Sequence, residues 1–183
     1  MKMLKNYTLT PPSGPPSVVL GIDPGIDRCG FAIITPSGRG MHVVDFGCIT
    51  TPRTQTTADR LIILQKELDH IMVKHKPTSA AVEKLFFFKN AKTIIEVSQA
   101  RGIILAALAA RAIPTGEYTP LEIKQAVTGY GRADKTQVIK MIRNILPIPP
   151  NAGKQPDDAF DALAIAYTHL TIQTYHTKHQ RSL

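Results

Sequence analysis

Four acidic side chains stand where carboxylates could do chemistry. Asp23 and Glu83 each follow a short apolar run typical of a buried strand, and Asp158 and Asp161 lie three residues apart near the start of a helical segment. That spacing places the last two on one helix face. Carboxylate oxygens are the ligands that Mg²⁺ prefers, and a pair of such ions can hydrolyse a phosphodiester. If the four acids converge, the pattern favours a magnesium site at which a phosphodiester could be hydrolysed.

Each acid also has a purely structural interpretation. Asp23 precedes Pro24 and Gly25, a sequence typical of turns, and aspartates suit the positively polarised start of a helix. Asp157 fits that second role best, as the N-cap of the last helix, and is set aside as a ligand. Without a cation, carboxylates brought together would repel one another. Spacing alone leaves open whether the four acids converge in space.

The charge of the chain indicates a polyanionic partner. Its 183 residues include 22 Lys and Arg against 14 Asp and Glu, which gives a net charge of +8 and a pI near 9.6. Such a balance is typical of proteins that bind nucleic acid, although basic charge also serves solubility alone. The two cysteines, Cys29 and Cys48, have no metal-ligand spacing and fit a reducing cytoplasm. No apolar run is long enough to cross a membrane.

The elements that must position the acids change in type along the chain. Three strands with short connections are expected first, as an antiparallel meander, at 18–22, 30–34 (stopped by Pro36) and 41–49. Later strands are expected at 80–82 and 115–119, and helices at 58–74, 91–112, 120–127, 134–146 and 156–175. This order predicts an α/β fold, a mixed β-sheet flanked by α-helices. The domain would span 18–175, between a flexible Pro-rich N-terminal tail at 1–17 and a C-terminal tail at 176–183.

The helix expected at 91–112, with Asn90 as its cap, is unusually apolar. Residues 103–108 are apolar nearly all round the helix. Such a helix is buried on more than one side. We expect the sheet to cover one side and a second subunit to cover another.

Several short motifs, taken together, carry a family resemblance. They are Gly21-Ile22-Asp23-Pro24-Gly25, Val82-Glu83 followed by Phe86, Lys89-Asn90-Ala91, Gln99-Ala100-Arg101-Gly102, Lys124-Gln125-Ala126-Val127-Thr128-Gly129, Lys135-Thr136-Gln137-Val138 and Asp158-Ala159-Phe160-Asp161-Ala162-Leu163-Ala164-Ile165-Ala166. In this order, from about 18 to 169, they resemble the RuvC family of Holliday junction resolvases. The resemblance implies an RNase H-like fold and the activity of a crossover junction endodeoxyribonuclease.

A member of that family would act as a homodimer on four-way DNA junctions in recombination and repair. The resemblance implies paired symmetric nicks made by two-metal-ion hydrolysis, with two Mg²⁺ ions per active site or Mn²⁺ in their place. It places the catalytic acids on Asp23, Glu83, Asp158 and Asp161. It also implies the RuvA–RuvB branch-migration complex as a partner.

DNA contacts follow from the same resemblance. The family's base-stacking phenylalanine falls on Phe86, but Phe87 and Phe88 follow directly, so which ring stacks on DNA stays open. The other rings would be core or dimer contacts. The cationic side chains expected to bind DNA phosphates are Lys124 and Lys135, which fall on two functional lysines of the family, and Lys84 and Lys89, which add positive charge near Glu83. At Lys84 this sequence departs from the family, which often has Gln there.

Two other functions remain open from the sequence. A different RNase H-like nuclease, acting on RNA–DNA hybrids or branched DNA, would use the same acids. Asp23-Pro24-Gly25 with Gly30 also resembles the phosphate loop of actin-like nucleotide-binding modules, but that class needs two such domains and this chain has room for one. The complete set of acids argues against a catalytically dead DNA-binding scaffold.

Overall fold

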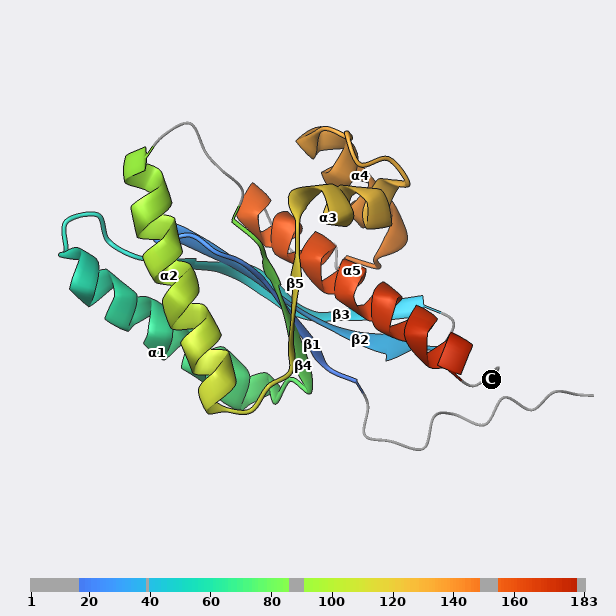
Figure 1. The fold of residues 1–183 in the computed structure, drawn as a ribbon, viewed down its shortest axis with the longest axis horizontal. Helices are drawn as coiled ribbons and strands as arrows, with labels where there is room; N and C mark the ends of the chain where they lie inside the picture. Colours follow the sequence, from blue (N-terminus) through green and yellow to red (C-terminus); the bar gives the residue numbers. More distant parts are fainter. Residues whose placement is uncertain (1–16, 39, 86–90, 149–154, 181–183) are drawn as a thin grey trace, which may run out of the picture.

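The computed structural model describes residues 17–38, 40–85, 91–148 and 155–180, which form a five-stranded sheet between two groups of helices (Figure 1). Helices α1 (Thr57–His75) and α2 (Ala91–Ala110) cover one face, and α3 (Pro120–Thr128), α4 (Lys135–Ile145) and α5 (Asp157–Gln180) lie on the other. The predicted sheet with flanking helices is confirmed. Within the described segments, no helix is long and apolar enough to cross a membrane.

The sheet is mixed, with its strands in the order β3-β2-β1-β4-β5. Strands β1 (Val19–Asp23), β2 (Arg28–Ser37) and β3 (Gly40–Thr50) form the expected antiparallel meander, while β4 (Ser79–Glu83) is parallel to β1 and β5 (Thr115–Tyr118) is parallel to β4. Ile22 is paired with Val82 in the β1–β4 register. The acid that follows each of them therefore ends its strand at the same edge of the sheet, where ligands of α/β proteins bind.

An apolar core on each face of the sheet holds the helices in place. Successive residues of a strand point to opposite faces, so Leu20 and Ile22 pack in the core beneath α1 and α2, together with Ile104. Val19 packs in the other core, beneath α3, α4 and α5. Asp23 has the same parity as Val19 and is therefore turned towards the face that α5 covers.

Capping boxes fix where α3 and α4 begin. Thr119 and Glu122 cap α3 reciprocally, and Asp134 and Gln137 do the same for α4. The capping box that the sequence predicts at Asp134 is thus confirmed. Both helices pack beside α5. The caps therefore also determine where Lys124 of α3 and Lys135 of α4 lie relative to Asp158 and Asp161 of α5.

The strand β2 is longer than the sequence indicates. Pro36 is expected to stop it, yet the strand continues to Ser37. The pairing of β1 with β2 ends at Ile34, so beyond that residue β2 has a neighbour on the β3 side only. A proline, which has no N–H to donate, is tolerated in this part of the strand because one side of it has no partner strand.

The last helix differs from expectation at both ends. Asp157 is its first residue rather than the N-cap before it, because the first-turn hydrogen bond runs from the Ala159 N–H to the Pro156 carbonyl. The helix continues to Gln180, since no proline or glycine ends it at Tyr175. The C-terminal tail expected from 176 is therefore helical through 180. Asn90 and the tail residues 1–16 lie outside the described residues.

Candidate active site

The four predicted acids lie together beneath the start of α5. Asp23 and Glu83 are the last residues of β1 and β4, and Asp158 and Asp161 lie in the first turns of α5. The Asp23 carboxyl interacts electrostatically with the carboxyls of the other three. The fold therefore brings about the convergence that spacing left open, while the catalytic and ligand roles of these residues stay a prediction.

Two glycines of the sheet allow α5 to come this close. A Cβ at Gly21 would lie 2.3 Å from the Ala162 carbonyl oxygen, and a Cβ at Gly30 would lie 2.0 Å from the Asp158 carbonyl oxygen. Any side chain at either position would push the helix away from the sheet. Gly30 is paired with Asp23 in the β1–β2 register, so the helix backbone passes directly over the strand position beside that acid.

Burial and mutual repulsion raise the pKa values of the acids. Desolvation, with added repulsion from the other three carboxyls, raises the pKa of Asp23 well above its ordinary value of 3.8. Desolvation and then Asp161 raise the pKa of Glu83 to about 7. Burial also raises the pKa of Asp161, although the hydrogen bond from Lys135 opposes the effect. Without a cation, carboxyl groups of this cluster therefore lose their protons at higher pH than ordinary carboxyls do, and Glu83 does so near pH 7.

Cationic side chains contact the acids on α5. Lys135 Nζ lies 2.9 Å from Asp161 Oδ2 and 3.7 Å from Asp157 Oδ2. Arg28 Nε lies 3.0 Å from Asp158 Oδ2. In this state the positive charge that the carboxylates require comes from the protein's own side chains.

A hollow of about 250 Å³ opens beside the acids. Glu83 and Asp161 line it together with Lys124, Lys135 and apolar side chains of α3, α4 and α5. Two of the four lysines predicted as DNA contacts, Lys124 and Lys135, are thus brought to the acids by the two capped helices. Ammonium groups next to carboxylates can hold a phosphate at the place where the carboxylates act.

The site fits a hard divalent cation, although its acids are not arranged around one as they stand. Among the described residues, no three His, Cys, Asp or Glu side chains are close enough to one point to hold a metal ion. However, Asp158 Oδ2 is buried and accepts no hydrogen bond from the described residues. Mg²⁺ prefers oxygen ligands, and it would supply the partner that this buried carboxylate oxygen lacks. Metal binding would then displace Lys135 and Arg28 from their carboxylates.

Two arginines that the sequence did not assign hold the ends of the acid-bearing strands. Arg101 of α2 donates from Nε to the Glu83 carbonyl oxygen at 3.3 Å and forms an ion pair with Glu117 of β5. Arg60, buried in α1, forms an ion pair with Asp27 in the loop that follows β1. Arg101 belongs to one of the resembling motifs, which was the only signal for it. No sequence signal pointed to Arg60, because its partner Asp27 is distant in sequence.

The predicted DNA contacts fall partly within the described residues. Lys84 is exposed directly after Glu83, and its backbone N–H donates to the Tyr118 carbonyl oxygen at 2.7 Å. This bond continues the β4–β5 pairing past the acid. The predicted contacts that lie outside the described residues are Phe86, Phe87, Phe88 and Lys89.

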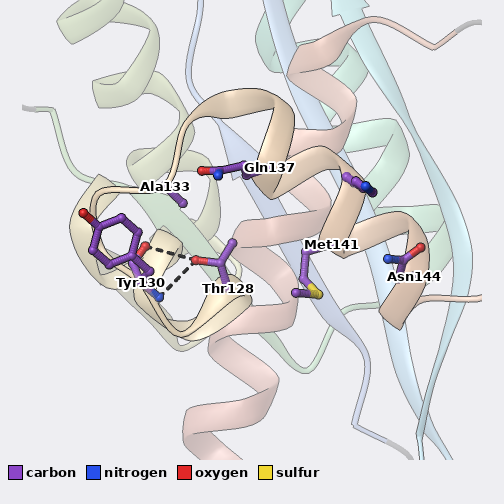
Figure 2. A pocket seen from close by; sticks show the side chains of 7 residues that line it. Thr128, Tyr130, Ala133, Gln137, Met141 and Asn144 are labelled. Carbon is purple, nitrogen blue, oxygen red and sulfur yellow. Dashed lines mark hydrogen bonds between the residues drawn. The ribbon is translucent and has the colours of Figure 1, made fainter.

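A larger hollow, of about 350 Å³, lies between the end of α3 and α4 (Figure 2). Thr128 Oγ1 donates to the Tyr130 carbonyl and accepts from the Tyr130 N–H, which closes the turn after α3. None of the described residues that line this hollow is Asp, Glu, His or Cys. Of the two hollows, the smaller one is lined by two of the predicted acids, Glu83 and Asp161.

Replacing Glu83 with Gln is expected to stabilise the metal-free protein at pH 8. The pKa of Glu83 is about 7 in the fold against an ordinary 4.5, so the folded protein binds this proton more tightly than the unfolded chain does. Glu83 therefore lowers stability as pH rises from about 4.5 to 7, and the full cost persists above 7. The amide avoids that cost, so we expect a gain of roughly 1–3 kcal/mol at pH 8 and almost none at pH 4.

Urea unfolding in the presence of EDTA at the two pH values measures this difference. Glu67→Gln, at an exposed position of α1, is the matched control and should change stability little at either pH. An equal gain from Glu83→Gln at pH 4 and pH 8 would show that its charge is not what costs stability.

Comparisons with known proteins show what the chain is similar to. The family model described as crossover junction endodeoxyribonuclease RuvC matches residues 19–169. A relative of the same description from Halothermothrix orenii is 48% identical over 152 residues, which cover 83% of this chain and 91% of the relative. Another, from Petrotoga mobilis, is 44% identical over 152 residues, which cover 83% of this chain and 92% of the relative.

Solved structures share the fold. T. thermophilus RuvC in complex with a Holliday junction substrate matches with a TM-score of 0.80 at 30% identity, covering 88% of this chain and 97% of that one. The yeast mitochondrial Holliday junction resolvase Ydc2 matches with a TM-score of 0.66, covering 94% of this chain and 87% of that one; at 17% identity this shows the fold alone. The expected RNase H-like architecture is confirmed.

Proposed function

Because the chain belongs to the RuvC family of crossover junction endodeoxyribonucleases, a class of metal-dependent nuclease, we propose that its four-acid site resolves four-way DNA junctions. The observation that carries this proposal is the meeting of Asp23, Glu83, Asp158 and Asp161 at one edge of the sheet, with Lys135 in contact. The relative whose structure contains a Holliday junction supports the choice of substrate.

The acids and the lysines have separate tasks in the proposed reaction. Asp23, Glu83, Asp158 and Asp161 would hold two Mg²⁺ ions, a choice that rests on their hard oxygen donors, which also suit Mn²⁺. When bound, such ions activate water and stabilise the departing oxygen. Lys124 and Lys135, which line the hollow with Glu83 and Asp161, bind the phosphate beside the acids. Lys135 would also offset the negative charge that develops on the phosphate oxygens in the transition state.

A cleavage assay with three substrates tests this function. The purified protein is incubated with Mg²⁺ and a labelled four-way junction, a linear duplex of the same sequence, or an RNA–DNA hybrid. We expect nicks at symmetric positions in two strands of the junction and none in the duplex. Equal cutting of the hybrid would instead indicate a different RNase H-like nuclease, and a junction left intact would refute the proposal.

Symmetric nicks need two active sites, and α2 offers a surface through which two copies can pair. Ile95 is 58% exposed, and Gln99, Gly102 and Ala106 follow on the same face of the helix and are exposed too. A Cβ at Gly102 would have no described atom within 4 Å, so another helix can approach closely. We propose that the homodimer forms through this face in an isologous contact.

The substitution Ile95→Glu is expected to weaken this dimer. A charge at the centre of an apolar contact costs on the order of 2 kcal/mol, so the dimer dissociation constant should rise roughly 10–100-fold. Sedimentation equilibrium measures it. Val44→Glu, at a 47% exposed position of β3, is the control and should sediment as the wild type does. Equal weakening by both variants would place the interface elsewhere.

Membership of the family supports three further proposals. Phe86 stacks on an unpaired base of the junction, while Lys84 and Lys89 bind the phosphates nearby. The protein acts together with the RuvA–RuvB branch-migration complex. It does so in the cytoplasm, the compartment to which its cysteine usage also points.

A further inference from the structure

Arg28 is a cationic residue of the site that no sequence motif singled out. It is the first residue of β2, two residues before Gly30. Alternate residues of a strand face the same side of the sheet, and the Asp158 backbone lies directly over Gly30. The Arg28 side chain is therefore directed to the start of α5, where its Nε lies 3.0 Å from Asp158 Oδ2.

The contact between Arg28 and Asp158 is incomplete. Asp158 Oδ2 is buried but accepts no hydrogen bond from the described residues, so the guanidinium neighbours it without bonding geometry. The Arg28 side chain is 56% exposed. A strong Arg–carboxylate pair uses two parallel N–H donors, and a loose, exposed pair adds little stability. Stabilisation of the fold does not account for this arginine.

The preceding residue does not hold Arg28 either. Asp27 forms ion pairs through Oδ2 with Arg53 and through Oδ1 with Arg60. Both of its oxygens are thus engaged by other arginines. Among the ion pairs of the described residues, Asp158 is the partner of Arg28.

Arg28 adds positive charge on a second flank of the acids. Lys135 contacts Asp161 and lines the 250 Å³ hollow, whereas Asp158 and Arg28 are not among the residues that line it. A DNA strand that passes over the acids would therefore meet lysines on one side and this arginine on the other.

We propose that Arg28 changes partner during the reaction cycle. While the acids hold no cation, it neutralises Asp158; once divalent cations are bound, it binds a phosphate of the DNA strand next to the scissile one. This inference rests on the proposed function. A cation that takes the Asp158 oxygen displaces the guanidinium, whose fork of N–H donors then matches the oxygens of a phosphate.

The exchange of partners predicts two effects of opposite sign for the substitution Arg28→Gln. Metal ions no longer compete with a guanidinium for Asp158, so Mg²⁺ should bind the DNA-free protein more tightly, by roughly 3–10-fold. The junction loses one phosphate contact, so its affinity should fall by a similar factor. The dependence of log K on log[salt] should also become shallower, by about 0.9.

Three measurements on the full-length protein test these effects. Calorimetric titration with Mg²⁺ alone gives the metal affinity. Junction binding in Ca²⁺ at increasing KCl gives the salt slope, and junction cleavage by the wild type in Mg²⁺ tests the proposed function separately. Arg111→Gln is the matched control, because Arg111 also pairs with one carboxylate, Asp69 Oδ1 at 2.7 Å, but Arg111 directly follows α2 and Asp69 lies in α1. It should leave Mg²⁺ affinity and salt slope unchanged.

Tighter Mg²⁺ binding together with a shallower salt slope in Arg28→Gln would support the exchange of partners. An unchanged slope, or weaker Mg²⁺ binding, would overturn it even if the wild type cleaves the junction normally. A distorted fold would weaken both kinds of binding, so the opposite signs separate the proposed role from a structural one.

Discussion

Replacing Asp23 with Asn is expected to abolish junction cleavage and leave junction binding intact. Asp23 lies at the centre of the acids, since its carboxyl interacts with Glu83, Asp158 and Asp161. The amide removes a charged ligand that the cations need, which costs several kcal/mol of transition-state stabilisation. Cleavage should therefore slow by roughly a thousand-fold or more. Single-turnover cleavage in Mg²⁺ and gel-shift titration of the junction measure the two properties.

Asp157→Asn is the control for this experiment. Asp157 is the neighbouring acid on α5, 65% exposed, and has no place among the proposed ligands. Its replacement should change the cleavage rate by no more than a few-fold. The Asp23→Asn enzyme should also unfold at no lower temperature than the wild type in EDTA, because burial raises the pKa of Asp23 and makes its charge costly. Normal cleavage by Asp23→Asn would refute the four-acid site.

The second large effect is expected from Gly30→Ala. The added Cβ would lie 2.0 Å from the Asp158 carbonyl oxygen, which belongs to helix backbone and cannot rotate away. Overpacking against backbone costs about 3 kcal/mol or more. To relieve the contact, the start of α5 must move and carry Asp158 and Asp161 with it. A displacement of about 1 Å at a catalytic group can cost roughly a hundred-fold in rate, so both stability and cleavage should fall.

Gly40→Ala is the matched control, at a sheet glycine where the nearest atom to an added Cβ is the Ser37 carbonyl oxygen at 3.9 Å. It should alter neither thermal unfolding nor the cleavage rate appreciably. If Gly30→Ala behaved like Gly40→Ala, the close approach of α5 to β2 would not be what positions its acids.

Local sequence signals were sufficient for most elements, but they left the role of each acid ambiguous. The continuous apolar run before Asp23 predicts a buried central strand, and the capping box at Asp134 fixes the start of α4. These signals are short in range and were not overridden by tertiary contacts. The prediction that β2 ends before Pro36 was wrong for the opposite reason. The absence of a β1 partner beyond Ile34 is a property of the sheet and not of the local sequence.

Contacts between distant residues could not be predicted from spacing. Nothing local says that Gly30 lies under Asp158, or that Arg101 donates to the Glu83 carbonyl. Strand alternation could have placed Arg28 on the same face as Gly30, but only once α5 was known to cover that face. The family resemblance supplied the acids as a set, and the fold supplied the side chains that support them.

The division of the acids between the early strands and α5 has a consequence for protein synthesis. Of the described elements, α5 leaves the ribosome last, and it carries two of the four acids. A nascent chain that has already paired β1 with β4 therefore has only half of the carboxylates that we propose as metal ligands. The proposed metal site forms when α5 docks on the finished sheet, late in the folding of the domain. Chains that are stalled or cut before this helix are expected to be harmless to chromosomal DNA.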